Sequence, residues 1–368
     1  MNGSEYPPGY HTRNEILSQP ACWEQCFRLM KEQLAGIRKQ VQSQADWLFV
    51  GCGSSYYIAQ SAAASWTALT RLRAKAAPAS EVLLFPDLIL SGSETYQPVL
   101  VSRSGHTSEV LRAAEYLELR RNIRTLAISC ANHQPLEAIS SSTLYLLPAD
   151  EKSTVMTRSF TSMLLGLQSL AAFMAGDEDF LSALARLPGM ADRALESMKP
   201  LIEEFVKAHE FADYVFLAQG PFLGVASESH LKIKEMSCSY AQVFHTLEFR
   251  HGPKAIVGPE TLVTFLLSET GYGAERDVLS EIKGLGATTL VITNQADAVV
   301  RQNADLLIEL NLDVPEVARL APYTLAGQIL GLCTGLKKGH NPDWPRNLSR
   351  AVVLSDDREN GSFQHASV

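Results

Sequence analysis

The segment Trp47–Ser55, with the sequence WLFVGCGSS, decides the fold. Its first four residues are all apolar, which is typical of a strand that is buried on both faces of a parallel sheet. Two glycines and two serines lie in the rest of the segment, and a stretch with helical periodicity comes after them. A buried strand that passes through such a turn into a helix is the first half of a βαβ unit.

This order of strand, turn and helix is repeated along the chain. Further apolar runs occur in the first half at Val99–Val101, Thr125–Ser129 and Leu144–Leu147, and in the second half at Tyr214–Leu217, Leu262–Leu267, Thr289–Thr293 and Leu306–Leu310. The offset between the halves is 167 residues from Trp47 to Tyr214, 166 from Ser102 to Ser268 and 164 from Thr125 to Thr289. Three nearly equal offsets in one order indicate an internal duplication. We therefore predict two doubly wound, flavodoxin-like α/β domains, each with a parallel sheet.

Length and composition also favour two domains. The 368 residues are 46% hydrophobic and 20% charged, which is an ordinary globular balance. The boundary is expected near Leu187-Pro188-Gly189, ahead of a long helix that runs through Lys207. We expect an N-terminal segment at 1–20, a first domain at 21–188, a second domain at 195–353, and a polar C-terminal tail at 354–368 to which we assign no role.

Charge and hydropathy argue against several classes of protein. The net charge of −8 disfavours a nucleic-acid binder, but an anionic small ligand could still be held by local N–H groups and hydroxyls. Residues 1–13 lack the apolar core of a signal peptide, and no apolar run reaches the roughly 18 residues of a membrane helix. The six scattered cysteines are typical of reduced thiols. We expect a cytoplasmic protein whose partners include neither nucleic acid nor a membrane.

Two turns in the first half carry the chemistry of a phosphate site. The first turn contains Gly53, Ser54 and Ser55, and the second contains Ser102, Ser104 and Thr107. In an open parallel sheet, ligands bind beyond the carboxyl ends of the strands, where a helix N-terminus offers free N–H groups to an anion. These hydroxyls could instead only cap the two helices. The matching turns of the second half have fewer hydroxyls, and Glu269 would repel a phosphate, so we expect one phosphate site per chain.

The second half carries the candidate acid–base residues. Glu228, Lys232 and Glu235 are spaced i, i+4 and i+7, which places them on one face of a helix. The same spacing would also suit a solvated face with salt bridges. His251 precedes Gly252-Pro253 and is therefore expected in a loop, where it could move protons near neutral pH or be an ordinary surface residue. The histidines show no zinc-like clustering, and we expect neither a metal nor an organic cofactor.

Together these motifs resemble those of the tandem SIS-domain sugar-phosphate isomerases and deaminases. The resemblance is to the isomerase half of glucosamine-6-phosphate synthase, without its glutaminase domain, and to related sugar-phosphate isomerases and deaminases. It extends from Glu15-Ile16 to Pro345-Arg346-Asn347-Leu348 and includes both turns and Lys232-Ile233-Lys234-Glu235. The segment Phe249–Lys254, with the sequence FRHGPK, is most similar to the deaminase members.

The resemblance implies a role for each candidate residue. The phosphate ligands of the family are matched by Ser55, Ser102, Ser104 and Thr107, with Arg103 where glutamine is usual. Glu235 matches the carboxylate that moves a proton between C1 and C2, and we place Lys232 beside it as catalytic and Glu228 as substrate-binding. His251 matches the histidine that opens the sugar ring. In the family that histidine comes from the neighbouring subunit, so a homodimer with a shared active site is implied.

The departures from the synthase concern the substrate. Met156-Thr157-Arg158 stands where the synthase has Ser-Thr-Lys, so one hydroxyl is lost while the positive charge is kept. Arg350 stands where the synthase has an imine-forming lysine, and an arginine could bind an oxygen or a phosphate but not form the imine. Without a glutaminase domain, the chain is not expected to take ammonia from glutamine by itself. We expect Thr157, Arg158 and Arg350 to bind a changed substrate.

The leading hypothesis is an isomerase/deaminase of an amino-sugar 6-phosphate. It would open the ring, move a proton between C1 and C2 and release ammonia or an amine, and a fructosamine-6-phosphate deglycase is an alternative. The second hypothesis is a non-catalytic sensor that binds a sugar phosphate and regulates a partner. The presence of both Glu235 and His251 favours the enzyme, because binding a phosphate requires neither residue. The sugar epimer and the direction of the reaction stay open.

Overall fold

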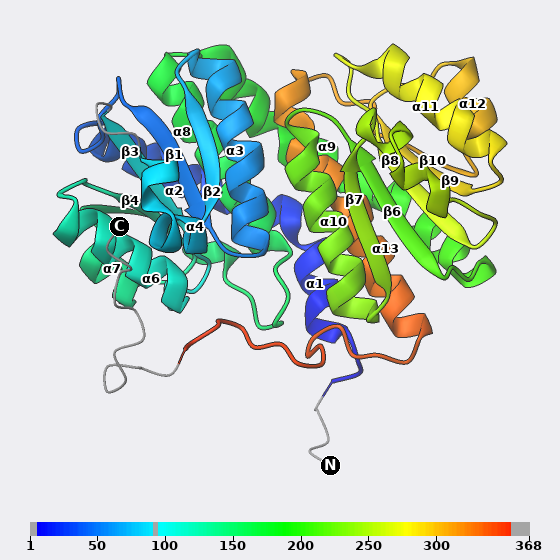
Figure 1. The fold of residues 1–368 in the computed structure, drawn as a ribbon, viewed down its shortest axis with the longest axis horizontal. Helices are drawn as coiled ribbons and strands as arrows, with labels where there is room; N and C mark the ends of the chain where they lie inside the picture. The colour runs from blue at the N-terminus through cyan, green and yellow to red at the C-terminus, as the bar shows by residue number, and fades with distance from the viewer. Residues whose placement is uncertain (1–5, 91–94, 355–368) are drawn as a thin grey trace.

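The chain forms two parallel five-stranded sheets flanked by helices in the computed structural model, which describes residues 6–90 and 95–354 (Figure 1). The first sheet has the order β2-β1-β3-β4-β5, with β1 at Asp46–Gly51, β2 at Ala74–Pro78, β3 at Tyr96–Val101, β4 at Leu126–Ser129 and β5 at Ser142–Tyr145. The second has the order β10-β9-β8-β6-β7, with β6 at Asp213–Ala218, β7 at Tyr240–His245, β8 at Thr261–Leu266, β9 at Thr288–Thr293 and β10 at Leu306–Glu309. The two orders coincide when β1–β5 are matched with β6–β10. The predicted pair of duplicated α/β domains is confirmed.

Helices connect the strands and extend both ends of the described chain. In the first domain and the segment before it they are α1 (Tyr10–Leu17), α2 (Gln19–Arg38), α3 (Ser54–Thr70), α4 (Ala79–Leu84), α5 (Pro86–Ile89), α6 (Ser108–Glu115), η1 (Tyr116–Arg120), α7 (Pro135–Ile139), η2 (Leu147–Ala149) and α8 (Arg158–Ala175). They continue with α9 (Glu178–Ala208), α10 (Phe222–Ser237), η3 (Glu248–Arg250), η4 (Pro253–Ile256), α11 (Tyr272–Gly284), α12 (Ala298–Asn303), η5 (Glu316–Arg319) and α13 (Leu320–Lys337). Within the described ranges, none of these helices is long and apolar enough to cross a membrane.

The edge strands β2 and β7 were not predicted from the sequence. β2 reads AKAAP and buries only Ala77, while β7 reads YAQVFH and exposes both of its ends. Each pairs with one neighbour only, β1 or β6. Neither strand has the continuous apolar run that marked the predicted strands, which include the opposite edge strands β5 and β10.

One apolar core continues from the first domain into the second. It includes Trp66 on α3, Met163 on α8, Val225 on α10 and Leu330 on α13, all of them buried. The backbones of α3 and α10 approach closely at Gly224, where an added Cβ would lie 2.5 Å from the carbonyl oxygen of Tyr57. This contact brings the turn that precedes α3 against the catalytic face predicted on α10.

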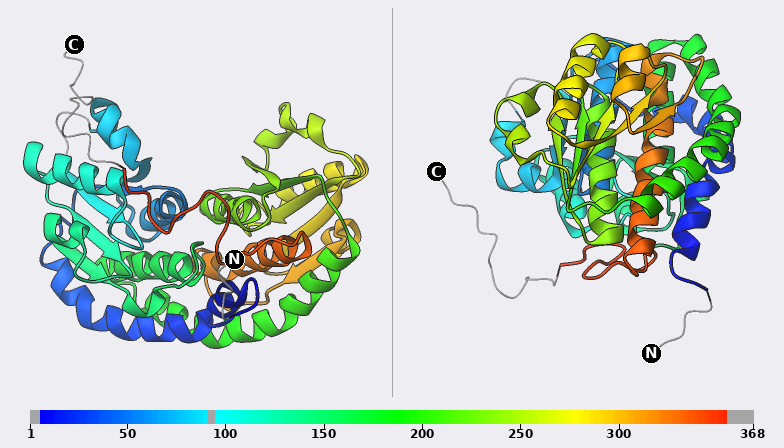
Figure 2. Two further views of the ribbon diagram at one scale, coloured as in Figure 1. Left: turned by 90° about the horizontal axis from the view of Figure 1, so that it is seen from below. Right: turned by 90° about the vertical axis from the view of Figure 1, so that its right-hand side faces the viewer.

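Helix α9 crosses the predicted domain boundary. Together with α2 it lines one side of the molecule, as the view from below shows (Figure 2). The helix begins at Glu178 and passes through Pro188 and Pro200 without a break. It buries an apolar face that includes Leu184, Leu187 and Ala191, and this packing outweighs the helix-breaking tendency of proline.

The residues that follow α13 return to the first domain (Figures 1 and 2). On the way, the carbonyl of Asp343 accepts a hydrogen bond of 2.9 Å from the N–H of Thr154. The segment then passes the turn between β3 and α6. Of the predicted C-terminal tail, residues 355–368 lie outside the described residues.

Candidate active site

Glu228, Lys232 and Glu235 form one charged cluster on α10. The Nζ of Lys232 lies 3.0 Å from Oε1 of Glu228 and 2.5 Å from Oε2 of Glu235. The side chains of Lys232 and Glu228 are fully buried, and that of Glu235 is 17% exposed. The spacing alone was equally consistent with a solvated face of salt bridges. The observed burial rules out a solvated face. Because it is costly to remove charged groups from water, a buried cluster of this kind is not ordinary surface decoration.

The cluster connects the two domains through Ser54. The Nζ of Lys232 donates a hydrogen bond of 3.4 Å to Oγ of Ser54, the first residue of α3. Ser54 follows Gly53, whose φ of 54° lies in the left-handed region that favours glycine. The first candidate turn and the face of α10 that carries the cluster therefore lie next to each other.

The buried charges alter one another's ionisation. Burial raises the pKa of Glu228 to about 7, the nearby Glu235 carboxylate adds to this, and Lys232 opposes it. Burial acts to lower the pKa of Lys232, but the two carboxylates outweigh burial and the net direction is upward. Lys232 therefore stays an ammonium group, and Glu228 can hold a proton near neutral pH.

The two predicted phosphate turns follow neighbouring strands, since β1 and β3 are hydrogen-bonded to each other. In the second turn, Oγ of Ser102 accepts a hydrogen bond of 3.1 Å from the N–H of Gly105, and Oγ of Ser104 accepts one of 3.2 Å from the N–H of His106. Neither α3 nor α6 begins with a side-chain capping bond, although Thr107 stands at the N-cap of α6. The capping interpretation is therefore wrong for both helices.

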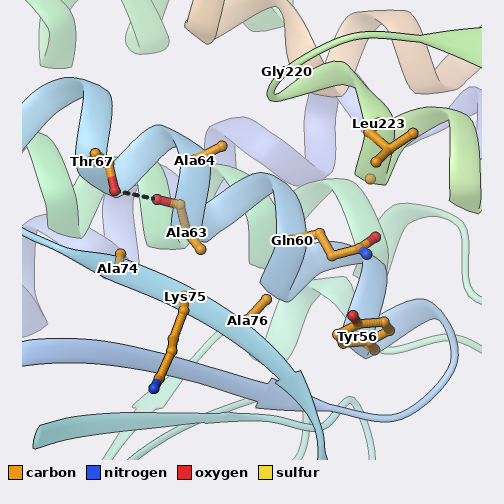
Figure 3. Close-up of a pocket in the computed structure, with 11 residues that line it drawn as sticks. Tyr56, Gln60, Ala63, Ala64, Thr67, Ala74, Lys75, Ala76, Gly220 and Leu223 are labelled. Atoms are coloured by element: carbon orange, nitrogen blue, oxygen red, sulfur yellow. Dashed lines mark hydrogen bonds between the residues drawn. The ribbon is translucent and has the colours of Figure 1, made fainter. Parts of the chain in front are cut away.

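A cavity of about 490 Å³ lies between α3, β2 and the turn that precedes α10 (Figure 3). Tyr56, Gln60 and Thr67 of α3 line it, together with β2 and the turn at Gly220. Gly220, with φ 53°, is the counterpart of Gly53 at the offset of 167 residues. At the same offset, Ser61, Ser65 and Ala68 of α3 stand where α10 carries Glu228, Lys232 and Glu235. The two helices are thus related by the duplication, and at these three positions only α10 has acid–base residues.

Comparison with known proteins identifies the family. The model of the SIS domain matches residues 42–173 and 213–330, which are the two sheets with their connecting helices. The chain belongs to the SIS domain family. The crystal structure of glucosamine-6-phosphate deaminase from Thermotoga maritima is 32% identical and covers 94% of this chain and 100% of that chain, with a TM-score of 0.77. The structure of tagatose-6-phosphate ketose/aldose isomerase from Escherichia coli has a TM-score of 0.83 at 21% identity, over 95% of this chain and 99% of that one, and shows a shared fold.

Relatives of this SIS protein include a longer class of enzyme. Glutamine--fructose-6-phosphate aminotransferase [isomerizing] from Methanothermobacter thermautotrophicus is 24% identical over 88% of this chain and 54% of its own length. The SIS protein thus spans about half the length of the curated relatives that it matches. The resemblance noted from the motifs is confirmed.

Arg103 of the SIS protein lies in the second turn, but its side chain points into the protein. Its terminal nitrogens donate to the carboxylate of Glu151 and to the carbonyl oxygens of Thr154, Val155 and Arg350. Only its buried Nε has no hydrogen-bond partner among the described residues. Protein oxygens thus occupy the terminal nitrogens, so a contact of the Arg103 guanidinium with the predicted phosphate would require these bonds to open.

The residues around α8 also bind protein groups. Thr157 is buried, and its N–H and hydroxyl donate to Oε1 of Glu151 at 2.7 and 2.8 Å. Arg158 donates to the carbonyl of Asp150, and the Arg350 guanidinium pairs with the Asp150 carboxylate. Burial acts to raise the pKa of Glu151, but Arg103 and the hydroxyl groups outweigh it and the net direction is downward. The predicted substrate contacts of Thr157, Arg158 and Arg350 would require these bonds to open.

His251 lies apart from the acid–base cluster. It is exposed, between η3 and η4, in a segment that projects from the second domain (Figure 2). Arg250 anchors this segment through bonds of 3.0 and 2.6 Å to the carboxylate of Glu281. Within the part of the chain that the structure describes, no hydrogen bond or ion pair joins His251 to α10.

Tyr57 is a site residue that the motifs did not reveal. Burial raises its pKa, and the carboxylates of Glu228 and Glu235 raise it further. Its ring lies 5.8 Å from that of His230, the neighbour of the cluster on α10. Its position three residues after Ser54, on the same face of α3, was the available signal.

Proposed function

We propose that this SIS protein is an isomerase/deaminase that acts on an amino-sugar 6-phosphate. The observation that carries the proposal is the buried cluster of Glu228, Lys232 and Glu235, joined through Ser54 to the first candidate phosphate turn. A protein that only senses a sugar phosphate would need the turns but not a buried ammonium between two carboxylates. The relatives of the chain, which include a glucosamine-6-phosphate deaminase, support the same class of reaction.

Glu235 is the proposed base. Of the two carboxylates that pair with Lys232, only that of Glu235 is open to solvent, so only it can meet a ligand without rearrangement. The Lys232 ammonium fixes its orientation at 2.5 Å and keeps a positive charge next to the reacting atoms. Glu228 lies on the buried side, and its raised pKa allows it to exchange a proton with the cluster.

The proposed reaction moves one proton at a time. The turn hydroxyls and helix N-termini hold the phosphate, and the sugar ring opens to expose C1 and C2. Glu235 removes a proton from one of these carbons and returns it to the other, so that the enzyme regains its starting state. With an amino sugar, the shift leaves an imine at C2, and addition of water releases ammonia and a ketose phosphate.

The ring-opening group in this proposal is His251 of a second copy. It is exposed on a projecting segment and makes no hydrogen bond to the acid–base cluster of its own chain, within the described residues. An imidazole has two ring nitrogens, one that can accept a proton and one that can donate it, which suits the transfer between the ring oxygen and the C1 hydroxyl. The proposal therefore includes a homodimer in which each site takes Glu235 from one chain and His251 from the other.

The test is turnover of a small panel of phosphates. Glucosamine 6-phosphate, galactosamine 6-phosphate, fructoselysine 6-phosphate and glucose 6-phosphate are each incubated with the protein, and ammonia, lysine and ketose phosphate are measured. Ammonia and a ketose phosphate from one amino sugar, lost in Glu235→Gln and kept in the exposed control Glu24→Gln, would support the proposal. Silence across the panel, with thermal stabilisation by one member, would favour the sensor. Release of lysine would favour the deglycase.

A further inference from the structure

Arg103 connects three segments that are distant in the sequence. It lies in the turn after β3, yet only 4% of the residue is exposed. Its Nη1 donates to Oε2 of Glu151 and to the carbonyl of Val155, both at 3.1 Å. Its Nη2 donates to the carbonyl of Thr154 at 2.8 Å and to that of Arg350 at 3.0 Å. One guanidinium thus joins the phosphate turn, the segment before α8 and the C-terminal segment.

The turn side of this connection is held firmly. The carbonyl of Arg103 accepts a hydrogen bond of 3.1 Å from the N–H of Cys130 and another of 3.1 Å from the hydroxyl of Ser129. Glu151 is fully buried and also binds the start of α8 through Thr157. Neither the backbone of Arg103 nor its principal ionic partner can therefore move without breaking buried bonds.

The C-terminal side has few other contacts. We call residues 349–354 the C-terminal strap. The N–H of Ser108 donates to the carbonyl of Val352 at 3.1 Å, and the N–H of Leu354 donates to the Ser108 hydroxyl at 2.9 Å. Val352, Val353 and Leu354 are all exposed, so the strap buries little apolar surface. Its position depends on a small number of polar bonds, and such segments open at low free-energy cost.

The strap lies where the phosphate is expected. Ser108 is the first residue of α6 and follows Thr107, and Ser104 is in the same turn. The bond from Arg103 to the Arg350 carbonyl and the ion pair of the Arg350 guanidinium with Asp150 hold the strap at its near end, and the bonds at Ser108 hold it further along. A guanidinium suits this task because it presents five N–H donors in one fixed plane, whereas an ammonium has three and a side-chain amide has two.

We propose that Arg103 is a positioning residue that holds the C-terminal strap over the phosphate turn, where the strap closes one side of the sugar-phosphate site. The choice of ligand rests on the proposed function above. Arg103 acts through protein oxygens, and binding of the phosphate is left to the turn hydroxyls and to free N–H groups. The strap limits escape of the ligand, so the first effect of losing Arg103 is on affinity.

The test compares Arg103→Gln and Arg103→Lys with the wild type, in the full chain. Hydrogen–deuterium exchange of a peptide covering 349–354 reports on the strap, and titration with inorganic phosphate reports on the site without any turnover. For Arg103→Gln we expect loss of strap protection, phosphate binding weakened by about tenfold to a hundredfold, and a similar rise in KM with kcat changed by less than about threefold. Arg103→Lys should lie between these results, because it can still pair with Glu151.

A second variant separates positioning from folding. Arg103→Gln alone leaves the buried Glu151 carboxylate unpaired, which would destabilise any protein. In Arg103→Gln/Glu151→Gln the pair is neutral, and the glutamine at 151 keeps an oxygen for Thr157. We expect this variant to recover Tm but to keep the exposed strap and the weak phosphate binding. Recovery of phosphate binding together with Tm, or an unchanged strap in Arg103→Gln, would overturn the proposal.

The outcome does not depend on whether the substrate has been named correctly. If no sugar of the panel is turned over but phosphate binding and strap protection fall together in both glutamine variants, the proposed enzyme fails and the role of Arg103 stands. If a sugar of the panel is turned over but protection of the strap is unchanged in the Arg103 variants, the proposed enzyme stands and the role of Arg103 fails.

Discussion

The Nζ of Lys232 lies 3.0 Å from the Oε1 of Glu228, and neither side chain has any contact with solvent. Replacing such a pair by apolar groups is often harmless, but removing one partner leaves an uncompensated buried charge. The pair is therefore a weak source of stability and a strong constraint on ionisation. It fixes the charge beside Glu235, the carboxylate that is open to solvent.

The pH dependence of stability should show the raised pKa of Glu228. Below the ordinary pKa of a glutamate, both the folded and the unfolded chain hold the proton, and no difference arises. Between that value and about 7 the unfolded chain loses the proton while the folded chain keeps it, so folding stability falls as the pH rises through this window. Above about 7 the loss is complete, and about 3 kcal/mol is its upper range.

Urea unfolding between pH 5 and 7.5 measures this effect. Over that range Glu228→Gln should lose less stability than the wild type, and the exposed Glu204→Gln is the control. Equal pH slopes in the wild type and Glu228→Gln would contradict the assignment.

Removing Lys232 should cost both stability and activity. Lys232→Met leaves two carboxylates facing each other without a counter-charge, and we expect a loss of about 3–5 kcal/mol in the free energy of unfolding. In the double variant Glu228→Gln/Lys232→Met, only the Glu235 carboxylate keeps its charge. The repulsion between the two carboxylates is then gone, so stability should recover while turnover stays low. Denaturant unfolding and the substrate panel measure the two quantities. Turnover that returned together with stability would show that Lys232 is only structural.

Glu235→Gln should separate binding from chemistry. The amide keeps the size of the side chain and its contact with Lys232, but it cannot remove a proton. We expect turnover to fall by about 10²–10⁴-fold while inorganic phosphate still binds as it does to the wild type. Steady-state kinetics and phosphate titration provide the measurement. An unchanged kcat would remove Glu235 from the mechanism.

Much of the fold could be predicted because the two halves of the sequence repeat the same order of apolar strands and turns. Eight of the strands are apolar runs, and their order in the two halves has nearly constant offsets. The strands β2 and β7 could not be found in this way, because neither contains a continuous apolar run. Pro188 was expected ahead of the long helix but lies inside α9, because the apolar face of that helix outweighs the local effect of proline.

The site could be predicted only in its local part. The spacing of Glu228, Lys232 and Glu235 indicated a shared face, but their burial depends on α3 and α13, which pack against α10 from elsewhere in the sequence. The direction of Arg103 follows from oxygen atoms at Glu151 and Arg350, 48 and 247 residues away. The local sequence contains no sign of these distant partners, so the direction of the Arg103 side chain could not be predicted from it.

The contact between α3 and α10 can be tested at Gly224. A methyl group there would lie 2.4 Å from the Ser61 hydroxyl and 2.5 Å from the carbonyl oxygen of Tyr57, and a backbone carbonyl cannot easily move away. We expect Gly224→Ala to lower the free energy of unfolding by about 1–3 kcal/mol. Gly189→Ala is the matched control, because it is also in a helix but has no atom near the added group, and it should stabilise by about 1 kcal/mol. Equal effects of the two substitutions would contradict the close approach of these helices.

A shared active site predicts a particular result when damaged subunits are combined. Glu235→Gln and His251→Ala homodimers should both be inactive, but a heterodimer of the two has one site in which Glu235 and His251 are intact. Co-expression with different tags should therefore restore about a quarter of wild-type activity in a random mixture. The control places both changes in one chain and pairs it with the wild type, and then neither site of the heterodimer is complete. If each chain instead uses its own His251, the outcomes are exchanged: the first heterodimer is silent, and the second keeps half of its activity. The comparison of the two purified heterodimers thus decides which chain supplies His251, whatever the sugar proves to be.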